Sequence, residues 1–156
     1  MKIKVGVLGL GYVGLPLAVE LSKNKKVVGY DINSKRIAHL NKNIDHNKEI
    51  SSTNLKKSKK NLFFTSDANN LIDCNFYIVT VPTPVNKRKQ PDLSLLKSAT
   101  QVVANNLRKN DIVVFESTVY PGVTEEICVP ILEKYSKLKF NHDFYCGYSP
   151  ERINPG

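Results

Sequence analysis

Three glycines near the start of the chain have the spacing of a phosphate-binding loop. Gly9, Gly11 and Gly14 form a G-x-G-x-x-G pattern directly after an apolar run. The first glycine of such a loop permits a sharp turn, the second lets backbone N–H groups approach a pyrophosphate, and the third lets the next helix pack closely on the sheet. The N-terminus of that helix offers unpaired N–H groups to phosphate oxygens. The pattern therefore predicts a dinucleotide site.

An acidic residue follows at the distance that such a site requires. Asp31 ends a second apolar run, about twenty residues after the glycines. Its carboxylate can accept hydrogen bonds from ribose hydroxyls and would repel a 2′-phosphate, which favours NAD over NADP. Arg36 complicates this interpretation, because an arginine there could neutralise such a phosphate or could be an exposed helix residue. With Asp31 present, we interpret Arg36 as a contact to the adenosine end of NAD.

The order of the surrounding elements strengthens this prediction. A glycine triplet alone occurs in many tight turns, but here a strand precedes it, and a helix, a second strand and an acid follow it. The alternative is a strand–helix–strand unit without a ligand. The residues of this unit predicted to bind NAD are Gly9, Leu10, Gly11, Tyr12, Val13, Gly14, Asp31 and Arg36.

Strand and helix signals alternate through the rest of the chain. Short apolar or β-branched runs predict strands at 2–8, 27–30, 62–65, 76–81, 111–115 and 144–147. Apolar residues at helical spacing predict helices at 12–23, 34–40, 92–107 and 123–135. This alternation predicts an α/β fold of the Rossmann type, doubly wound around a mostly parallel, six-stranded sheet.

Single residues indicate some helix boundaries. Asn33 or Ser34 is expected to cap the second helix and Asp92 the third, because these side chains accept hydrogen bonds from a first helical turn. Pro130 is expected to bend the last helix. The polar stretch 41–60 is expected to be an insertion with one short helix at most.

Composition indicates a folded protein of a reducing compartment. Of 156 residues, 41% are hydrophobic and 24% charged, which is ordinary for one globular domain. The three cysteines and three histidines lack the spacing of a disulfide framework or a metal site, so no metal is predicted. The uncharged run 5–19 carries the glycines and no cleavage site, so we expect a cytoplasmic protein without a membrane segment.

The formal net charge of +9 has two interpretations. Lysine clusters at 23–26, 56–60 and 87–89 carry much of the charge. Such clusters are usually solvated surface, and no aromatic residues are interleaved to stack on bases, so we expect no nucleic-acid partner. The alternative is a basic rim that attracts an anionic nucleotide. A non-catalytic nucleotide- or nucleic-acid-binding Rossmann module is the second hypothesis for the whole chain.

Three further motifs follow predicted strands. They are Val81-Pro82-Thr83-Pro84, Glu116-Ser117-Thr118-Val119-Tyr120-Pro121-Gly122 and Gly147-Tyr148-Ser149-Pro150-Glu151-Arg152-Ile153-Asn154-Pro155-Gly156. Ligands of an open α/β sheet bind beyond the carboxyl ends of its strands, so these segments are expected beside the glycine loop.

With these motifs the chain resembles, over essentially its whole length, the N-terminal NAD-binding domain of the UDP-glucose/GDP-mannose dehydrogenase family. The E-S-T-V-Y-P-G and S-P-E-R-I-N-P-G segments are most similar to the branch that acts on UDP-N-acetylhexosamines for bacterial surface polysaccharides. The resemblance implies a two-step oxidation of a sugar C6 hydroxyl to a carboxylate, with two NAD molecules used in turn. It implies a homodimer for the full-length enzyme and leaves a monomer open for this chain. A β-hydroxyacid or short-chain dehydrogenase fits the later motifs less well.

The resemblance also implies roles for residues after the later strands. Thr83 would lie against NAD, Thr118 near the nicotinamide and the reacting carbon, and Glu151 would orient water or the nicotinamide. Thr83 could instead shape a rigid loop, Thr118 cap a helix, and Glu151 be solvated. By this analogy the catalytic residues are Thr118 and Glu151, the further cofactor residues are Val81, Pro82, Thr83, Ser117, Thr118 and Val119, and the substrate residues are Gly147, Tyr148, Ser149, Pro150, Glu151 and Arg152.

One part of the family's chemistry has no counterpart in the sequence. The family's second oxidation uses a cysteine in a downstream G-G-x-C-L-P-K-D-like segment, and none of Cys74, Cys128 and Cys146 has that context. The family's central dimerisation helix and UDP-binding domain are also missing. We therefore expect residues 1–156 to be a single NAD-binding domain that does not turn over substrate alone.

Overall fold

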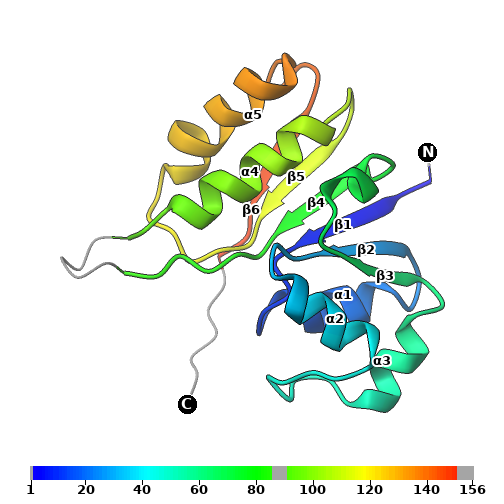
Figure 1. Ribbon diagram of the computed structural model, residues 1–156. Coiled ribbons are helices and arrows are strands. Elements are labelled where there is room, and N and C mark those ends of the chain that lie inside the picture. The colour runs from blue at the N-terminus through cyan, green and yellow to red at the C-terminus, as the bar shows by residue number, and fades with distance from the viewer. Residues whose placement is uncertain (1, 86–90, 151–156) are drawn as a thin grey trace.

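Six parallel strands form one sheet in this computed structural model, which describes residues 2–85 and 91–150 (Figure 1). The strands are β1 (Lys4–Leu8), β2 (Lys26–Tyr30), β3 (Leu62–Thr65), β4 (Phe76–Val79), β5 (Ile112–Phe115) and β6 (Tyr145–Tyr148). Their order is β3-β2-β1-β4-β5-β6, and each neighbouring pair is parallel. This confirms the predicted doubly wound Rossmann-type sheet, whose strand order reverses between β1 and β4.

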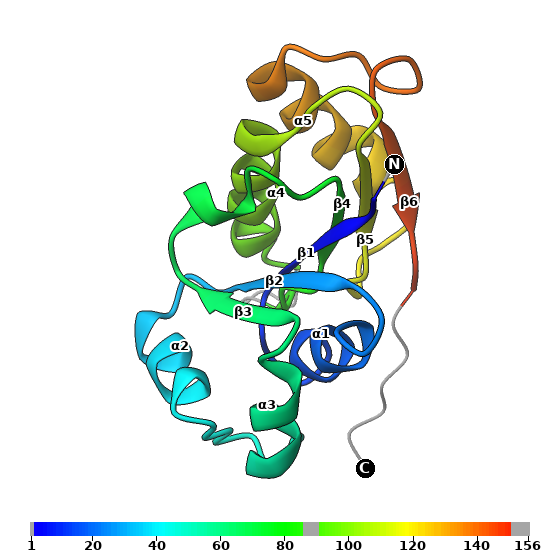
Figure 2. The same ribbon diagram turned by 90° about the vertical axis from the view of Figure 1, so that its right-hand side faces the viewer.

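Helices cover both faces of the sheet. They are α1 (Gly14–Leu21), α2 (Ser34–Asn41), α3 (Ser52–Ser58), α4 (Ser94–Asn106) and α5 (Val129–Ser136), with a short 3-10 turn η1 (Ala68–Leu71) and a π-helical turn η2 (Thr124–Cys128). Figures 1 and 2 show α1, α2 and α3 on one face, and α4 and α5 on the other. The helices of each half of the chain therefore cover one face.

An apolar cluster fills the space on each side of the sheet. Val5 and Val7 of β1 pack in the cluster that contains α1, α2 and α3 residues. Leu8 of the same strand packs in the cluster that contains α4 and α5 residues. Burial on both faces explains why the strands have nearly continuous apolar sequences.

The register of the strands brings their carboxyl ends to one edge of the sheet. Leu8 of β1 pairs with Tyr30 of β2 and with Val79 of β4. Val79 pairs with Phe115 of β5, which pairs with Tyr148 of β6. The residues that come next in the chain are Gly9, Asp31, Thr80, Glu116 and Ser149. Five loops therefore begin at the same edge, as the sequence predicts.

The last helical segment has the predicted extent. The sequence predicts one helix over 123–135, and in the structure the π-helical turn η2 continues directly into α5, which begins at Val129. Pro130 thus lies in the first turn of α5, where a missing N–H is tolerated. The bend expected at Pro130 stays a prediction.

The predicted caps have mixed outcomes. Asn33 caps α2, where its side chain accepts a hydrogen bond from the Arg36 amide at 3.1 Å. Asp92 is not the N-cap of α4, because Leu93 holds that position. The Asp92 carboxylate still accepts the Ser94 amide at 2.9 Å. The one short helix expected in the polar stretch is α3.

Candidate functional site

The glycine loop turns tightly between β1 and α1. Gly9 has a φ of +95°, which an L side chain rarely adopts. A Cβ atom on Gly14 would lie 1.8 Å from the Gly9 carbonyl oxygen, so only glycine fits there. A Cβ atom on Gly11 would meet no atom within 4 Å. The second glycine therefore borders open space just before the N-terminus of α1, where the sequence predicts a pyrophosphate.

Thr80, which the sequence analysis did not single out, supports this loop from the end of β4. Its hydroxyl lies 2.7 Å from the Gly9 carbonyl oxygen and 3.0 Å from that of Leu8, and it can donate its proton to either. A Cβ atom on Gly14 would also lie 2.3 Å from this hydroxyl. The glycine loop and β4 therefore fit closely against each other.

Asp31 binds the glycine loop with one carboxylate oxygen and the start of α2 with the other. Oδ2 accepts a hydrogen bond from the Leu10 amide at 2.8 Å, and Oδ1 accepts one from the Asn33 amide at 2.9 Å. A carboxylate has about four lone-pair sites, so each oxygen can still accept a ribose hydroxyl. Asp31 lies where the sequence places it and has a second role in holding the loop.

Arg36 is buried rather than solvated. Its side chain is only 11% exposed and forms an ion pair with Asp45, in which Nη1 lies 2.7 Å from Oδ1. Its Nε atom donates to the Leu10 carbonyl oxygen at 2.9 Å. The buried Nη2 atom has no hydrogen-bond partner within the part of the chain that the structure describes. The interpretation of Arg36 as an exposed helix residue is therefore wrong.

Asp45 anchors the polar stretch between α2 and α3. Its side chain has no exposed surface, and it accepts hydrogen bonds from the amides of Asn47 at 3.1 Å, Glu49 at 2.9 Å and Ile50 at 3.1 Å. Burial alone would raise the pKa of Asp45, but the hydrogen bonds from Ile50, Arg36 and Asn47 and the charge of Arg36 hold it below its ordinary value. The carboxylate is therefore charged at neutral pH.

A pocket of about 340 Å³ opens beside the glycine loop. Its polar side contains Asp31, Asn33, Arg36 and Asn47. The end of β1, the glycine loop, Tyr30 and Ile32 also line it. The β4 loop and α4 contribute Val81, Pro82, Leu95, Ser98, Ala99 and Val102. The sequence indicates only a packing face for α4. The fold shows that this helix also borders the pocket, whose size and mixed lining suit the adenosine end of a dinucleotide.

Hydrogen bonds join the loops that follow β4 and β5. The Ser117 hydroxyl donates to the Val81 carbonyl oxygen at 2.9 Å. The Thr83 hydroxyl donates to the carbonyl oxygen of Thr118. Two motifs that lie far apart in the sequence are therefore held together beside the glycine loop.

The loop that follows β6 joins the same group. The Ser149 amide donates to the Phe115 carbonyl oxygen at 3.0 Å, and the Tyr148 hydroxyl donates to that of Val119 at 3.3 Å. Gly147 lies within β6, and Pro150 is the last described residue of this segment. Glu151 and Arg152 lie outside the described residues.

Thr118 does not cap the next helical segment. The turn η2 begins at Thr124, six residues after Thr118. Its N-cap position is held by Val123. Thr118 is exposed, as is Tyr12 of the glycine loop, and Val13 is half-buried. The structure thus leaves Thr118 in the loop beside Thr83.

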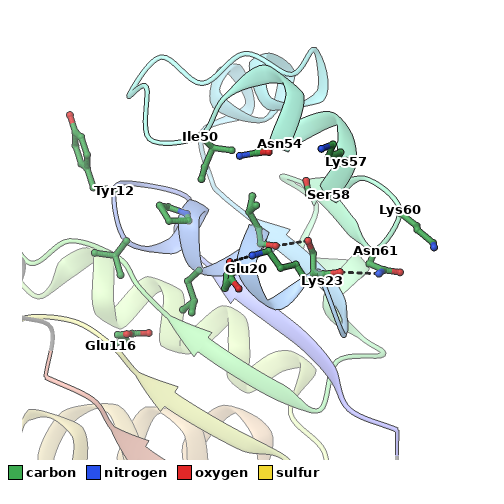
Figure 3. A pocket seen from close by; sticks show the side chains of 15 residues that line it. Tyr12, Glu20, Lys23, Ile50, Asn54, Lys57, Ser58, Lys60, Asn61 and Glu116 are labelled. Carbon is green, nitrogen blue, oxygen red and sulfur yellow. Dashed lines mark hydrogen bonds and ion pairs between the residues drawn. The ribbon is translucent and has the colours of Figure 1, made fainter.

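A larger hollow of about 760 Å³ lies between α1 and α3 (Figure 3). Tyr12 and Glu116 stand at one end of it, and several lysines at the other. Within it Lys23 pairs with Glu20 at 2.6 Å. The hollow is not lined by Asp31, so we assign the cofactor to the smaller pocket.

The described lysine clusters do not form a rim around the cofactor pocket. Lys25 and Lys26 stand at the start of β2, and Lys59 and Lys60 come just before β3. These are amino ends of strands, whereas the pocket lies at carboxyl ends. The cluster at 87–89 lies outside the described residues.

None of the three cysteines has the character of a nucleophile. Cys74 and Cys128 are buried, and Cys146 is half-buried. Burial raises the pKa of Cys74 and of Cys128 to about 11, and that of Cys146 to about 12. Protonated thiols react poorly. Within residues 2–85 and 91–150, no group of three or more His, Cys, Asp or Glu side chains is placed to hold a metal ion.

Comparison with known proteins places this site in a family. The model of the NAD-binding domain of the UDP-glucose/GDP-mannose dehydrogenase family matches residues 3–156. The chain belongs to this family. Its cofactor is NAD, and the resemblance seen in the sequence motifs is confirmed.

Individual members of the UDP-glucose/GDP-mannose dehydrogenase family are closely similar. The UDP-N-acetyl-D-glucosamine 6-dehydrogenase of Pseudomonas aeruginosa is 57% identical over 154 residues, covering 99% of this chain and 36% of its own length. Protein CapL of Staphylococcus aureus is 50% identical, covering 100% and 36%. The structure of a UDP-D-ManNAc dehydrogenase from Pyrococcus horikoshii has a TM-score of 0.90 at 36% identity, covering 99% and 37%. The chain thus spans 36% of the length of these curated relatives.

The described residues fit an NAD molecule. The space beside Gly11 is open to a pyrophosphate, and α1 begins directly after it. Asp31 and Arg36 line the same pocket beside this loop. The buried Nη2 atom of Arg36 is a hydrogen-bond donor that lacks a protein acceptor in the described chain. These features supply groups for the phosphates and for the adenosine.

Proposed function

We propose that this chain is the NAD-binding part of a nucleotide-sugar 6-dehydrogenase that oxidises the C6 hydroxyl of a UDP-N-acetylhexosamine to the uronic acid. The observation that carries the proposal is the joining of the β4, β5 and β6 loops beside the glycine loop, through Ser117, Thr83 and Tyr148. These loops carry the motifs of the N-acetylhexosamine branch. The 57% identity to a UDP-N-acetyl-D-glucosamine 6-dehydrogenase supports this branch.

The loops would position the reaction around NAD, which accepts a hydride from C6 when bound. The Thr83 hydroxyl holds the backbone of Thr118, which would lie near the nicotinamide and the reacting carbon. Gly147, Tyr148, Ser149 and Pro150 would line the sugar pocket. By the family analogy Glu151 would orient water or the nicotinamide, and Arg152 would contact the substrate.

The second oxidation requires a nucleophile that the three thiols do not supply. Their raised pKa values leave them protonated at neutral pH. A covalent step needs an activated nucleophile. We therefore propose that this nucleophile, the UDP-binding surface and the dimer interface belong to a longer protein.

We also propose a cytoplasmic location and a role in surface-polysaccharide synthesis. The use of NAD and the three free cysteines support a reducing compartment. In the described residues no helix is both long and apolar enough to cross a membrane. The similarity to protein CapL and to the N-acetylglucosamine enzyme supports the branch.

Titration calorimetry with NAD, NADP and a random DNA duplex at physiological salt tests the cofactor role. We expect NAD to bind and the duplex not to bind. If the duplex bound tightly while NAD did not, the non-catalytic nucleic-acid-binding module would replace the enzyme.

A kinetic measurement tests the substrate. In a protein that joins this chain to the remaining length of its relatives, we expect UDP-N-acetylglucosamine to drive NADH formation and this chain alone to form none. In the same protein Thr118→Val should lower kcat, because Thr118 would lie near the nicotinamide and the reacting carbon. NADH formation from UDP-glucose at equal efficiency would contradict the assignment to the N-acetylhexosamine branch.

A further inference from the structure

An arginine beside the ribose-binding acid usually indicates a different cofactor. In dinucleotide-binding folds an acid after the second strand selects NAD, and a nearby arginine accommodates the 2′-phosphate of NADP. This chain has both, because Asp31 and Arg36 line the same pocket. A second feature must therefore decide whether Arg36 is available to a phosphate.

The contacts of Arg36 use two of its five N–H groups, those on Nε and Nη1. Nε binds the Leu10 carbonyl oxygen at 2.9 Å, and Nη1 binds Asp45 at 2.7 Å. Bidentate recognition of a phosphate needs two parallel N–H groups of the guanidinium. Nε and Nη1 each already hold one bond, and Nη2 alone has no partner among the described residues, so a phosphate would have to share Nη1 with Asp45 or bind through Nη2 alone.

Several contacts fix the position of the Asp45 side chain. Its side chain is fully buried, and three backbone amides of its own loop, from Asn47, Glu49 and Ile50, bind its oxygens. The loop thus presents the carboxylate to Arg36 as a fixed group. Asp45 lies nine residues beyond Arg36 in the sequence, and no motif marks it.

We propose that Asp45 is a specificity-determining residue that sets the preference for NAD over NADP, because its ion pair holds Arg36 on the glycine loop and cancels the charge of the guanidinium. This inference rests on the cofactor assignment above. Asp45 acts through Arg36 and is a positioning residue.

The charge balance gives the direction of the effect. Asp31 and Asp45 carry one negative charge each and Arg36 one positive charge, so these three groups together carry a net charge of −1, which disfavours a 2′-phosphate. An uncharged residue at 45 makes the three positions neutral and releases Nη1. For one unit charge removed about 10 Å from the phosphate, at an effective dielectric constant near 20, NADP affinity should rise about tenfold.

The test compares the dissociation constants of NAD and NADP for this chain by titration calorimetry. We expect Asp45→Asn to raise the ratio of NADP affinity to NAD affinity about tenfold. Adding Arg36→Met to that variant should remove the gain, because no guanidinium is then left to meet the phosphate. Asp45→Ser, which keeps a short oxygen acceptor for the loop amides, provides a second uncharged variant if the asparagine variant folds poorly.

The matched control is Asp111→Asn. Asp111 is also a buried carboxylate that accepts a backbone amide, from Arg108, but it stands at the amino end of β5, on the edge opposite the pocket. The Asp111→Asn variant should lose stability without changing the ratio of NADP affinity to NAD affinity.

Two outcomes would overturn the inference. Asp45→Asn and Asp45→Ser would contradict it if they left the ratio of NADP affinity to NAD affinity unchanged, as in the Asp111→Asn control. This includes the case in which both affinities fall in proportion. A wild-type chain that bound neither cofactor would overturn the NAD assignment and the inference together. NAD binding with an unchanged ratio would overturn the inference alone.

Discussion

The Oδ2 atom of Asp31 accepts a hydrogen bond from the backbone amide of Leu10 at 2.8 Å. This bond ties the middle of the glycine loop to the end of β2. The second oxygen of the same carboxylate accepts the Asn33 amide at 2.9 Å. The residue that the sequence assigns to the ribose is therefore also part of the scaffold that shapes the phosphate loop.

Replacing Asp31 with Asn should weaken both roles. An asparagine keeps one oxygen acceptor, so its NH₂ group must face one of the two amides, and that lost bond should lower the free energy of unfolding by about 1–2 kcal/mol. NAD affinity should fall about tenfold, because one ribose acceptor is also lost. Urea unfolding and calorimetry measure the two effects.

Asp73→Asn, an exposed carboxylate at the other end of the sheet, is the control and should change neither. Wild-type stability in the Asp31 variant would contradict the scaffold role.

Alanine substitutions at two glycines of the same loop should affect different properties, stability at Gly14 and NAD affinity at Gly11. A Cβ atom on Gly14 would lie 1.8 Å from a backbone oxygen, so Gly14→Ala should lower stability by about 3 kcal/mol. A Cβ atom on Gly11 meets nothing within 4 Å, so Gly11→Ala should fold with a Tm close to that of the wild type. Its methyl group would stand where the pyrophosphate approaches, and NAD affinity should fall at least about tenfold. Thermal unfolding and NAD titration distinguish the two. Unchanged NAD binding in Gly11→Ala would place the phosphates elsewhere.

Local spacing was sufficient to predict the glycine loop and Asp31. All of these residues belong to one strand–helix–strand unit, whose geometry fixes the distance between them. The same holds for Asn33 as a cap of α2, because a cap acts within its own first turn. Sequence patterns within one strand–helix–strand unit therefore predict which of its residues are in contact.

Thr80 and Asp45 could not be predicted in this way. Thr80 reaches the Gly9 carbonyl only because β4 pairs with β1, and no local pattern encodes that register. Asp45 lies in a stretch with weak periodicity, and its partner Arg36 becomes apparent only when the loop folds back onto α2. The π-helical turn η2 just before Pro130 could not be predicted either, because the apolar spacing gives no sign of a single wide turn.

The cysteines should be unreactive in the folded protein. Burial raises the pKa of each thiol to about 11 or about 12, so the thiolate fraction near neutral pH is very small. We expect Ellman's reagent to release almost no thionitrobenzoate from the native chain, and an amount equal to all three thiols in concentrated urea. Free cysteine at the same pH is the control for reagent activity. One rapidly reacting thiol would instead mark a candidate nucleophile within this chain.

The ion pair of Asp45 and Arg36 should make stability depend on pH in the acid range. The pKa of Asp45 in the folded chain lies below its ordinary value of 3.8, so the unfolded chain binds the proton first as the pH falls. The stability that this carboxylate contributes is therefore complete above about pH 5 and is lost as the pH falls through the folded pKa.

Asp45→Asn isolates this contribution from those of the other carboxylates. At about pH 7 the variant should be less stable than the wild type by about 3 kcal/mol, because it leaves the buried guanidinium of Arg36 without its charge partner. The difference should shrink steadily below about pH 4, since the protonated Asp45 of the wild type then also lacks its charge. Urea unfolding of both proteins across this range measures the difference. His46 and Glu49, on the same loop, are exposed and remain in both proteins, so they cancel in the comparison. A difference that stayed constant into the acid range would mean that the charge of Asp45 does not contribute to stability through Arg36.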